Sequence, residues 1–339
     1  MYEEFFGLAR SPFLPTPDPQ CLFLTTAHRE GLAGLVCALL RRRGITVLTG
    51  EAGTGKTTLL RAVLESISAS RGQVSLVFHP TLAPAEFFEL ALLELGMHDV
   101  PSSKARRLVE LREFLFQQQG KGRVVVLVVE EAHKLYPEVL EEIRLLTNFE
   151  TATGKLLQVL LVAQNELDIL LSRPGLERLR QRIAYRLTLK PLEASEIAAY
   201  LQYRWSKAGA ACALPLSEDA VDYLGVFSGG IPRVINAICD HALMLVFRQG
   251  VREVWPEHIV TAARDLNLCA ANAGCGLHQV AACGGAPQLR APADVLSASS
   301  EGAGEEAADR GGPIPMPALG RRLVVAKAAH SARWEGEAG

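Results

Sequence analysis

The sequence lacks the charge bias and the long apolar runs that are typical of exported, membrane-spanning or non-specifically nucleic-acid-binding proteins. Its 35 Lys and Arg residues nearly balance 37 Asp and Glu residues, so the net charge is −2 and no large field of one sign exists. This balance argues against strong non-specific DNA binding by the whole surface. Glu3 and Glu4 occupy the place where a signal peptide would carry positive charge, and no run of about 18 strongly apolar residues could span a bilayer.

The seven cysteines form no recognisable framework. They are scattered, without a CxxC pair and without a histidine at metal-site spacing. An odd, unpatterned set predicts reduced thiols in a cytosolic protein and argues against a zinc site. The remaining composition, 49% hydrophobic and 21% charged over 339 residues, indicates a globular protein of about two domains.

Hydrophobic patterning divides the chain into four parts. Residues 1–24 are aromatic and proline-rich, and we expect an extended arm that packs Phe5, Phe6 and Phe13 onto a core. Residues 25–191 open with a helix capped near Thr25 or Thr26 and then alternate strands with helices, which predicts a parallel sheet covered on both sides. Residues 192–268 predict a small all-helical domain, whereas residues 269–339 are rich in Ala and Gly.

We expect this carboxy-terminal tail to be mostly disordered. Ala and Gly supply 28 of the 69 residues from Ala271 onward, and Trp334 is the one aromatic residue among them. Such a segment buries too little apolar surface to offset the entropy of ordering it.

One glycine-rich turn carries a specific chemistry. The segment GEAGTGKT fits the pattern G-x-x-x-x-G-K-[ST] and lies between a β-branched strand and a long helix. Backbone N–H groups of such a turn curl around phosphates, and the positive end of the following helix faces them. A chance match is the alternative, but the strand–loop–helix context argues against it. The predicted nucleotide-binding residues are Gly50, Glu51, Ala52, Gly53, Thr54, Gly55, Lys56, Thr57 and Thr58.

Within this turn, two side chains have separate predicted roles. Lys56 would reach the β- and γ-phosphates of ATP, and the Thr57 hydroxyl would ligate Mg²⁺. A second strand must then supply carboxylates. The apolar run 124–129 leads into Glu130, which by position would bind the Mg²⁺ shell, and Glu131, which would polarise the attacking water. A solvated charge pair that ends a strand is the competing interpretation.

Three polar or charged residues elsewhere in the chain are further candidates for the nucleotide site. Gln164 follows a strand, where an amide could sense the γ-phosphate or could simply belong to a turn. Arg182 is favoured among the four arginines of LERLRQRIAYRLTL as one that reaches a neighbouring subunit's γ-phosphate; the alternative is a solvated basic face. Arg233, placed at a helix start by Pro232, could fold onto the nucleotide from the lid side or be an ordinary surface arginine.

Taken together, the motifs resemble those of the AAA+ ATPases of the ExeA/GspA type, accessory ATPases of secretion and pilus biogenesis. The resemblance covers roughly residues 1–266. It rests on MYEEFFGLARSPFLPTPDP, the HRE before the first helix, LTGEAGTGKTT, PTLAPAEFF, EEAHKL, IRLLTNFET, LLQVLLVAQNEL, QRIAYRLTLKPL and GGIPRVINAICDHAL. It implies an α/β P-loop NTPase fold, with a parallel sheet flanked by helices and a carboxy-terminal helical lid domain.

The same resemblance implies roles for particular residues. Lys56 and Thr57 correspond to the Walker A pair, Glu130 and Glu131 to the Walker B pair; Gln164 resembles the first sensor and Arg233 the lid arginine. The family usually has Asp-Glu-Ala-Gln where this chain has Glu-Glu-Ala-His. Glu is one methylene longer than Asp, which predicts altered metal geometry and slow hydrolysis.

The predicted function is therefore a cytoplasmic, oligomeric ATPase that uses ATP and Mg²⁺ to remodel a protein partner or drive its assembly. The partner is expected in a secretion or cell-envelope export system, with peripheral association at an inner-membrane complex. Secretion members continue into a membrane span and a peptidoglycan-binding domain, whereas this chain continues into the Ala/Gly-rich tail, so we expect the ATPase module alone. Two alternatives are a nucleotide-gated switch with negligible hydrolysis and a DNA-associated ATPase. The near-neutral charge makes DNA the less favoured partner, despite the basic cluster 41–43.

Overall fold

The computed structural model describes residues 1–14, 21–69, 72–77 and 82–268. The predicted disordered tail, 269–339, lies outside these described residues, as do residues 15–20 within the predicted arm. None of the described helices is long and apolar enough to cross a membrane.

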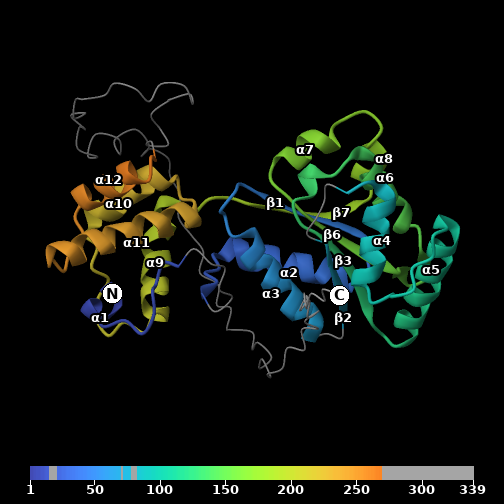
Figure 1. The fold of residues 1–339 in the computed structure, drawn as a ribbon, viewed down its shortest axis with the longest axis horizontal. Helices are drawn as coiled ribbons and strands as arrows, with labels where there is room; N and C mark the ends of the chain where they lie inside the picture. The colour runs from blue at the N-terminus through green and yellow to red at the C-terminus, as the bar shows by residue number, and fades with distance from the viewer. Residues whose placement is uncertain (15–20, 70–71, 78–81, 269–339) are drawn as a thin grey trace, which may run out of the picture. The chain divides into compact units, whose positions relative to one another are not determined.

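A five-stranded parallel sheet forms the centre of the larger domain (Figure 1). Its strand order is β2-β3-β6-β1-β7, and every neighbouring pair is parallel. The strands are β1 (Ile45–Gly50), β2 (Gly72–Val77), β3 (Val124–Val129), β6 (Leu157–Val162) and β7 (Ile183–Leu189). All residues of β1, β3 and β6 are buried, which explains why these strands are almost continuously apolar. The predicted α/β sheet is confirmed.

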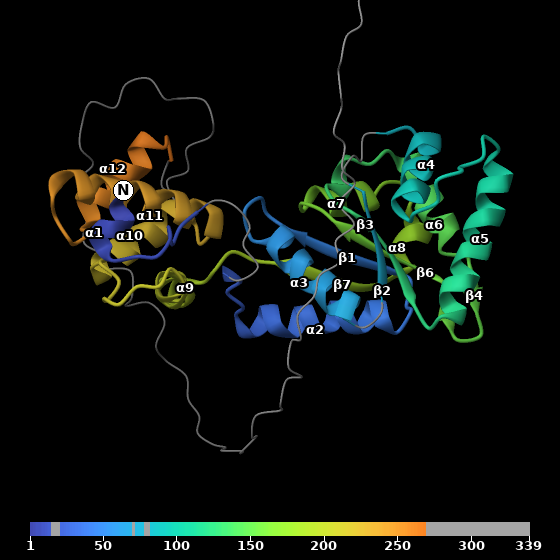
Figure 2. The ribbon, with the colours of Figure 1, turned by 60° about the horizontal axis from the view of Figure 1, so that its bottom comes forward.

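Helices cover both faces of this sheet (Figure 2). Val126 and Val128 of β3 pack toward α2 (Thr26–Leu40) and α3 (Lys56–Ala69), whereas Leu127 and Val129 pack toward the opposite layer. That layer consists of α4 (Pro84–Glu94), α5 (Lys104–Gly120), α6 (Pro137–Leu146), α7 (Glu166–Leu171) and α8 (Glu177–Arg180). Because successive side chains of a strand point to opposite faces of the sheet, the core consists of two apolar layers, one on each face.

Two short features of the larger domain have no counterpart in the sequence prediction. A two-stranded antiparallel hairpin joins β4 (Glu150–Thr151) to β5 (Gly154–Lys155). A 3₁₀ turn, η2 (Ala132–Lys134), directly follows the acidic residues after β3.

The second domain is all-helical, as predicted. It contains α9 (Ala194–Lys207), α10 (Glu218–Ser228), α11 (Pro232–Gln249) and α12 (Pro256–Asp265). Its core is separate from the layers around the sheet and includes Trp205, Leu224, Ile238 and Ile259, which are fully or almost fully buried.

The amino-terminal arm differs from the extended segment that the sequence predicts. Tyr2–Phe6 forms a helix, α1, which ends at Gly7 with φ 67°. The expectation of an extended arm is wrong here because a helix places Tyr2 and Phe6 on one face, where both are buried against the lid core. The expected packing of the aromatic residues does occur: Phe6 and Phe13 are buried, and Phe5 packs against the same core.

Three further hydrogen bonds position the arm and the start of α2. Buried Arg204 of α9 donates through Nε to the carbonyl of Pro12 over 2.7 Å and through Nη2 to that of Leu14 over 3.3 Å. The predicted cap of α2 is confirmed at Thr25, whose side chain accepts from the backbone N–H of His28 over 3.2 Å.

Candidate functional site

The turn between β1 and α3 has the shape of an anion cradle. Gly53 and Gly55 have φ of 87° and 101°, which non-glycine residues rarely adopt. Within the described ranges, the backbone N–H groups of both glycines lack an acceptor. Thr54, which is 4% exposed, stabilises the turn by donating from Oγ1 to the carbonyl of Glu51 over 2.8 Å. Free amides beside a helix start fit a phosphate group.

Lys56 lies inside this turn and is 9% exposed. Its Nζ donates to the carbonyl oxygens of Gly50 and Glu51, each over 2.8 Å. An ammonium group has three donors, so one remains for a ligand. Burial lowers the pKa of Lys56, and nearby Arg233 lowers it further, whereas Glu131 opposes the shift. An added anion would relieve this cost of a buried cation.

The two predicted acids take different positions. Glu130 follows β3 and meets the first turn of α3, where the Thr57 hydroxyl donates to its Oε2 over 3.4 Å. Burial raises the pKa of Glu130, as does neighbouring Glu131, while the bond from Thr57 opposes the shift. Two oxygen donors that meet in this way suit a hard divalent cation such as Mg²⁺.

Glu131 faces the same cavity as Lys56. Its backbone has φ 55°, in the left-handed region, so the chain turns sharply as it leaves β3. Its Oε2 lies 3.1 Å from Lys134 Nζ and 3.7 Å from His133 Nε2. Gln164, two residues beyond the end of β6, lines the cavity as well.

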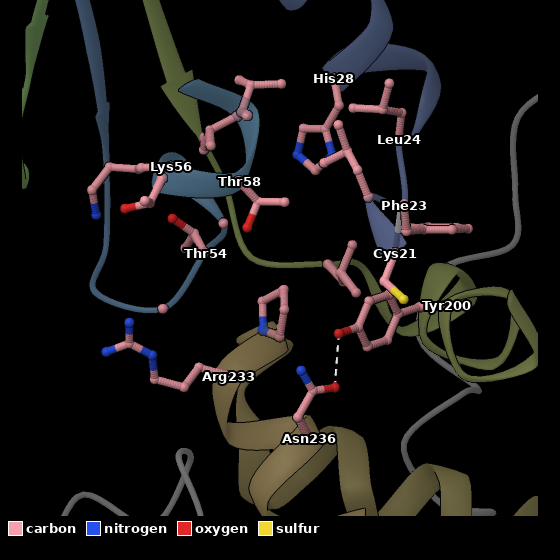
Figure 3. Close-up of a pocket in the computed structure, with 18 of the residues that line it drawn as sticks. Cys21, Phe23, Leu24, His28, Thr54, Lys56, Thr58, Tyr200, Arg233 and Asn236 are labelled. Atoms are coloured by element: carbon pink, nitrogen blue, oxygen red, sulfur yellow. Dashed lines mark hydrogen bonds between the residues drawn. The ribbon is translucent and has the colours of Figure 1, made fainter. Parts of the chain in front are cut away.

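The lid reaches the phosphate turn through the start of α11. The backbone N–H of Arg233 donates to the carbonyl of Gly53 over 3.2 Å, and Arg233 lines the cavity. Figure 3 shows its guanidinium on the same side as Lys56 and Thr54. Arg233 therefore lies where the sequence predicts a lid-side arginine, at the phosphate end of the cavity.

Lys56, Glu131, Gln164 and Arg233 line one cavity of about 330 Å³, whereas Glu130 is not among its lining residues. The volume of this cavity is within the usual range of about 300–1,000 Å³ for small-molecule sites. Residues 52–58 of the turn line it, whereas Gly50 and Glu51 contribute through the carbonyls that hold Lys56. Its two ends differ in chemistry (Figure 3). Lys56 and Arg233 make one end cationic, and Thr54 lies at the same end; the other end is mostly apolar.

The apolar end contains residues to which the sequence assigns no role. Phe23 and Leu24 come from the arm, His28 from α2, and Tyr200 and Asn236 from the lid (Figure 3). Tyr200 donates to Asn236 Oδ1 over 2.8 Å, which orients that side chain. This mixture of apolar, aromatic and polar side chains suits a planar base. No local motif could identify them, because they come from four separate parts of the chain: the arm, α2, α9 and α11.

His28 has an unusual environment at this end. Burial lowers its pKa below the ordinary value of 6.5, and the charge of Glu196 only partly opposes the shift. The imidazole is therefore held in its neutral form at lower pH than an exposed histidine.

Arg182 is not brought to this cavity. It lies just beyond α8, before β7, and its Nη1 donates to Asn148 Oδ1 over 2.6 Å and to the Arg144 carbonyl over 3.4 Å. β7 runs parallel to β1, so Arg182 precedes the strand end that is opposite the phosphate turn. Within one chain Arg182 cannot serve the site, and its predicted role requires a second copy.

The residues present fit MgATP. The turn offers amides and a buried ammonium for phosphates, and Thr57 and Glu130 offer oxygen ligands for Mg²⁺. The other end of the cavity offers a mostly apolar lining for a base. A phosphate turn, an acidic strand end and a lid arginine thus converge on one cavity.

Comparison with known proteins agrees with this geometry. Residues 40–171 match the family model described as AAA domain. The chain is 38% identical over 269 residues to General secretion pathway protein A of Aeromonas hydrophila, a match that covers 79% of this chain and 49% of that protein. The chain thus spans about half the length of this curated relative.

Solved structures support the fold. The Cdc6p protein of Pyrobaculum aerophilum superposes with a TM-score of 0.58 at 19% identity, covering 75% of this chain and 70% of that one. The ORC2 protein of Aeropyrum pernix, solved as ADPNP-ADP complexes, superposes with a TM-score of 0.53 at 15% identity, covering 71% of this chain and 68% of that one. At these identities the likeness shows a shared fold alone.

Proposed function

We propose a function from the premise that this chain belongs to the AAA+ P-loop NTPases of the ExeA/GspA type. The chain binds ATP with Mg²⁺ in the cavity between the phosphate turn and the lid, and it hydrolyses the bound ATP. The convergence of Lys56, Glu131, Gln164 and Arg233 on one cavity is the observation that carries this proposal.

In the proposed mechanism the protein positions charge and performs no covalent chemistry. The amides of Gly53 and Gly55 and the Lys56 ammonium bind the phosphates. Thr57 and Glu130 would hold Mg²⁺, which would supply neutralisation of the charge on the phosphate oxygens. Glu131 orients the attacking water and accepts its proton.

Two polar groups complete the site. Gln164 senses the γ-phosphate, and Arg233 adds positive charge from the lid. Both line the cavity, which supports these roles. Because Arg233 also bonds to Gly53, nucleotide occupancy can change the lid position. Arg182 would reach the γ-phosphate of an adjacent subunit, so the active form is a homo-oligomer in which one chain completes the site of the next.

The hydrolysis cycle would remodel a protein partner or drive its assembly. The relative's name, General secretion pathway protein A, supports a partner in secretion or in a related cell-envelope or exopolysaccharide export system. We propose a cytoplasmic location with peripheral association at an inner-membrane complex.

A second candidate is a nucleotide-gated switch with negligible hydrolysis. Two observations favour it: Glu130 occupies the place of the usual Asp, and the Glu131 carboxylate is engaged by Lys134 over 3.1 Å. Phosphate release from ATP with Mg²⁺ separates the candidates. Turnover that disappears in Lys56→Ala supports the ATPase, and tight ATP binding without turnover supports the switch. Salt-sensitive retention on DNA would instead favour a DNA-associated ATPase.

A further inference from the structure

His133 lies between two groups of the proposed catalytic site. Its Nδ1 accepts a hydrogen bond from the backbone N–H of Gln164 over 3.3 Å. Its Nε2 lies 3.7 Å from Oε2 of Glu131. The side chain is 11% exposed, so the ring is packed rather than solvated. One imidazole therefore connects the segment after β6 with the carboxylate after β3.

The contact at Nδ1 determines what Nε2 can do. A neutral imidazole has one N–H donor and one acceptor. Because Nδ1 accepts from the Gln164 amide, the proton of the neutral ring must be on Nε2. The donor of His133 consequently faces Glu131, and a small movement of either side chain would close 3.7 Å to a hydrogen bond.

Other contacts of Glu131 hold its carboxylate less firmly. Lys134 Nζ is 3.1 Å from the same oxygen, but the lysine side chain is 53% exposed, and exposed ion pairs contribute little to ordering a side chain. His133, in contrast, is largely buried and is bonded at its far side to the backbone. The imidazole is thus the more rigid contact of the Glu131 carboxylate.

We propose that His133 is a positioning residue that couples Glu131 to the Gln164 segment. When Gln164 responds to the γ-phosphate, its backbone moves the imidazole, and the imidazole sets the orientation of the Glu131 carboxylate toward water. This inference rests on the proposed ATPase function, since it assigns an orienting partner to the same general base. His133 itself touches neither nucleotide nor water in this role.

Three substitutions at His133 distinguish the role of Nδ1 from the role of Nε2. His133→Ala removes both contacts. His133→Asn retains an acceptor near the position of Nδ1 but is too short to reach Glu131. His133→Gln carries an acceptor and a donor at the end of its amide and can replace both contacts. His98→Ala, at an exposed histidine elsewhere in the chain, is the matched control.

Steady-state hydrolysis of MgATP by the full chain tests the proposal. We expect kcat to fall about tenfold or more in His133→Ala and His133→Asn, with KM changed less than about twofold, because orientation rather than binding is lost. His133→Gln should recover most of kcat. If His133 only satisfies the Gln164 amide, His133→Asn will match the wild type, and the proposal is wrong.

A second measurement does not depend on turnover. In ¹⁵N-histidine-labelled protein at pH 8, the His133 ring, assigned by its absence in His133→Gln, should show a protonated Nε2 and an unprotonated Nδ1. The opposite tautomer would overturn the proposal. A wild type that neither binds nor hydrolyses ATP would instead overturn the proposed function, and with it the role of His133. Full turnover in His133→Ala would overturn the His133 inference alone.

Discussion

The backbone N–H of Arg233 donates to the carbonyl oxygen of Gly53 over 3.2 Å, which joins the first turn of lid helix α11 to the phosphate turn. A Cβ atom at Gly53 would lie 2.9 Å from Cβ of Arg233 and 3.0 Å from Cγ2 of Ile231. The lid therefore approaches the turn at a place where only glycine fits.

Gly53→Ala should weaken ATP binding by about tenfold or more, because the new methyl group displaces Arg233 from the phosphate end of the cavity. The substitution also adds about 1–2 kcal/mol of backbone strain, since φ here is 87°. Gly175→Ala is the matched control: its φ is 95°, but nothing lies within 4 Å of the added methyl group. Both variants should lose stability, and only Gly53→Ala should lose affinity for ATP in calorimetric titration. Equal affinities would contradict the proposed lid contact.

Glu131→Gln should retain ATP binding and lose turnover by about 100-fold or more, since the amide is nearly isosteric but cannot accept a proton. The variant should therefore accumulate bound ATP, measurable as unhydrolysed nucleotide that co-elutes with the protein. Glu138→Gln, at an exposed position in α6, should behave as wild type. Unchanged phosphate release in Glu131→Gln would remove Glu131 from the mechanism.

Glu130→Asp should raise Mg²⁺-dependent turnover severalfold if the longer carboxylate slows hydrolysis. In the present chain Glu130 contacts Thr57 directly over 3.4 Å, and a side chain shorter by one methylene would leave more space for the hydrated cation between them. The measurement is the phosphate-release rate at saturating ATP across a Mg²⁺ titration. A lower rate in Glu130→Asp would show that glutamate suits this site better.

Stability should fall on acidification because of His28. Its pKa in the folded chain lies below the unfolded value of about 6.5, so the unfolded chain binds the proton more readily. The contribution of neutral His28 to the free energy of unfolding is therefore complete above pH 6.5 and is lost as the pH falls through the pKa of the folded chain. The urea-unfolding free energy of the wild type should decrease between pH 7.5 and 5 by more than that of His28→Gln. Identical pH dependence would show that His28 is not held neutral by burial.

The sequence predicts the phosphate turn well because all its determinants are local. Gly53, Gly55 and Lys56 are contiguous with a β-branched strand and a helix, so pattern and structure coincide. The buried run of β3 likewise indicates where Glu130 and Glu131 must lie, because parallel strands end at one edge of the sheet.

Other parts depend on contacts that no local pattern encodes. Tyr200 and Asn236 reach the apolar end of the cavity because the lid packs against the arm. His133, which follows β3, meets the Gln164 amide because β3 and β6 are neighbours in the sheet. The arm itself is predicted as extended from its prolines and aromatics, yet α1 forms because it buries Tyr2 and Phe6 against the lid. In each case tertiary packing decides the outcome.

Calorimetric titration of the full chain with MgATP, compared between the wild type and Lys56→Ala, tests the central claim most directly. Lys56 donates to the carbonyls of Gly50 and Glu51 and keeps one donor for phosphate. Lys56→Ala removes both the charge-assisted bond to phosphate and the two bonds that order the turn. ATP binding should therefore weaken by about 100-fold or more. Lys190→Ala, at an exposed lysine, should leave binding unchanged. One ATP bound per chain, with this loss in Lys56→Ala, is the predicted result. No heat in the wild type, or equal affinity in Lys56→Ala, would contradict the account.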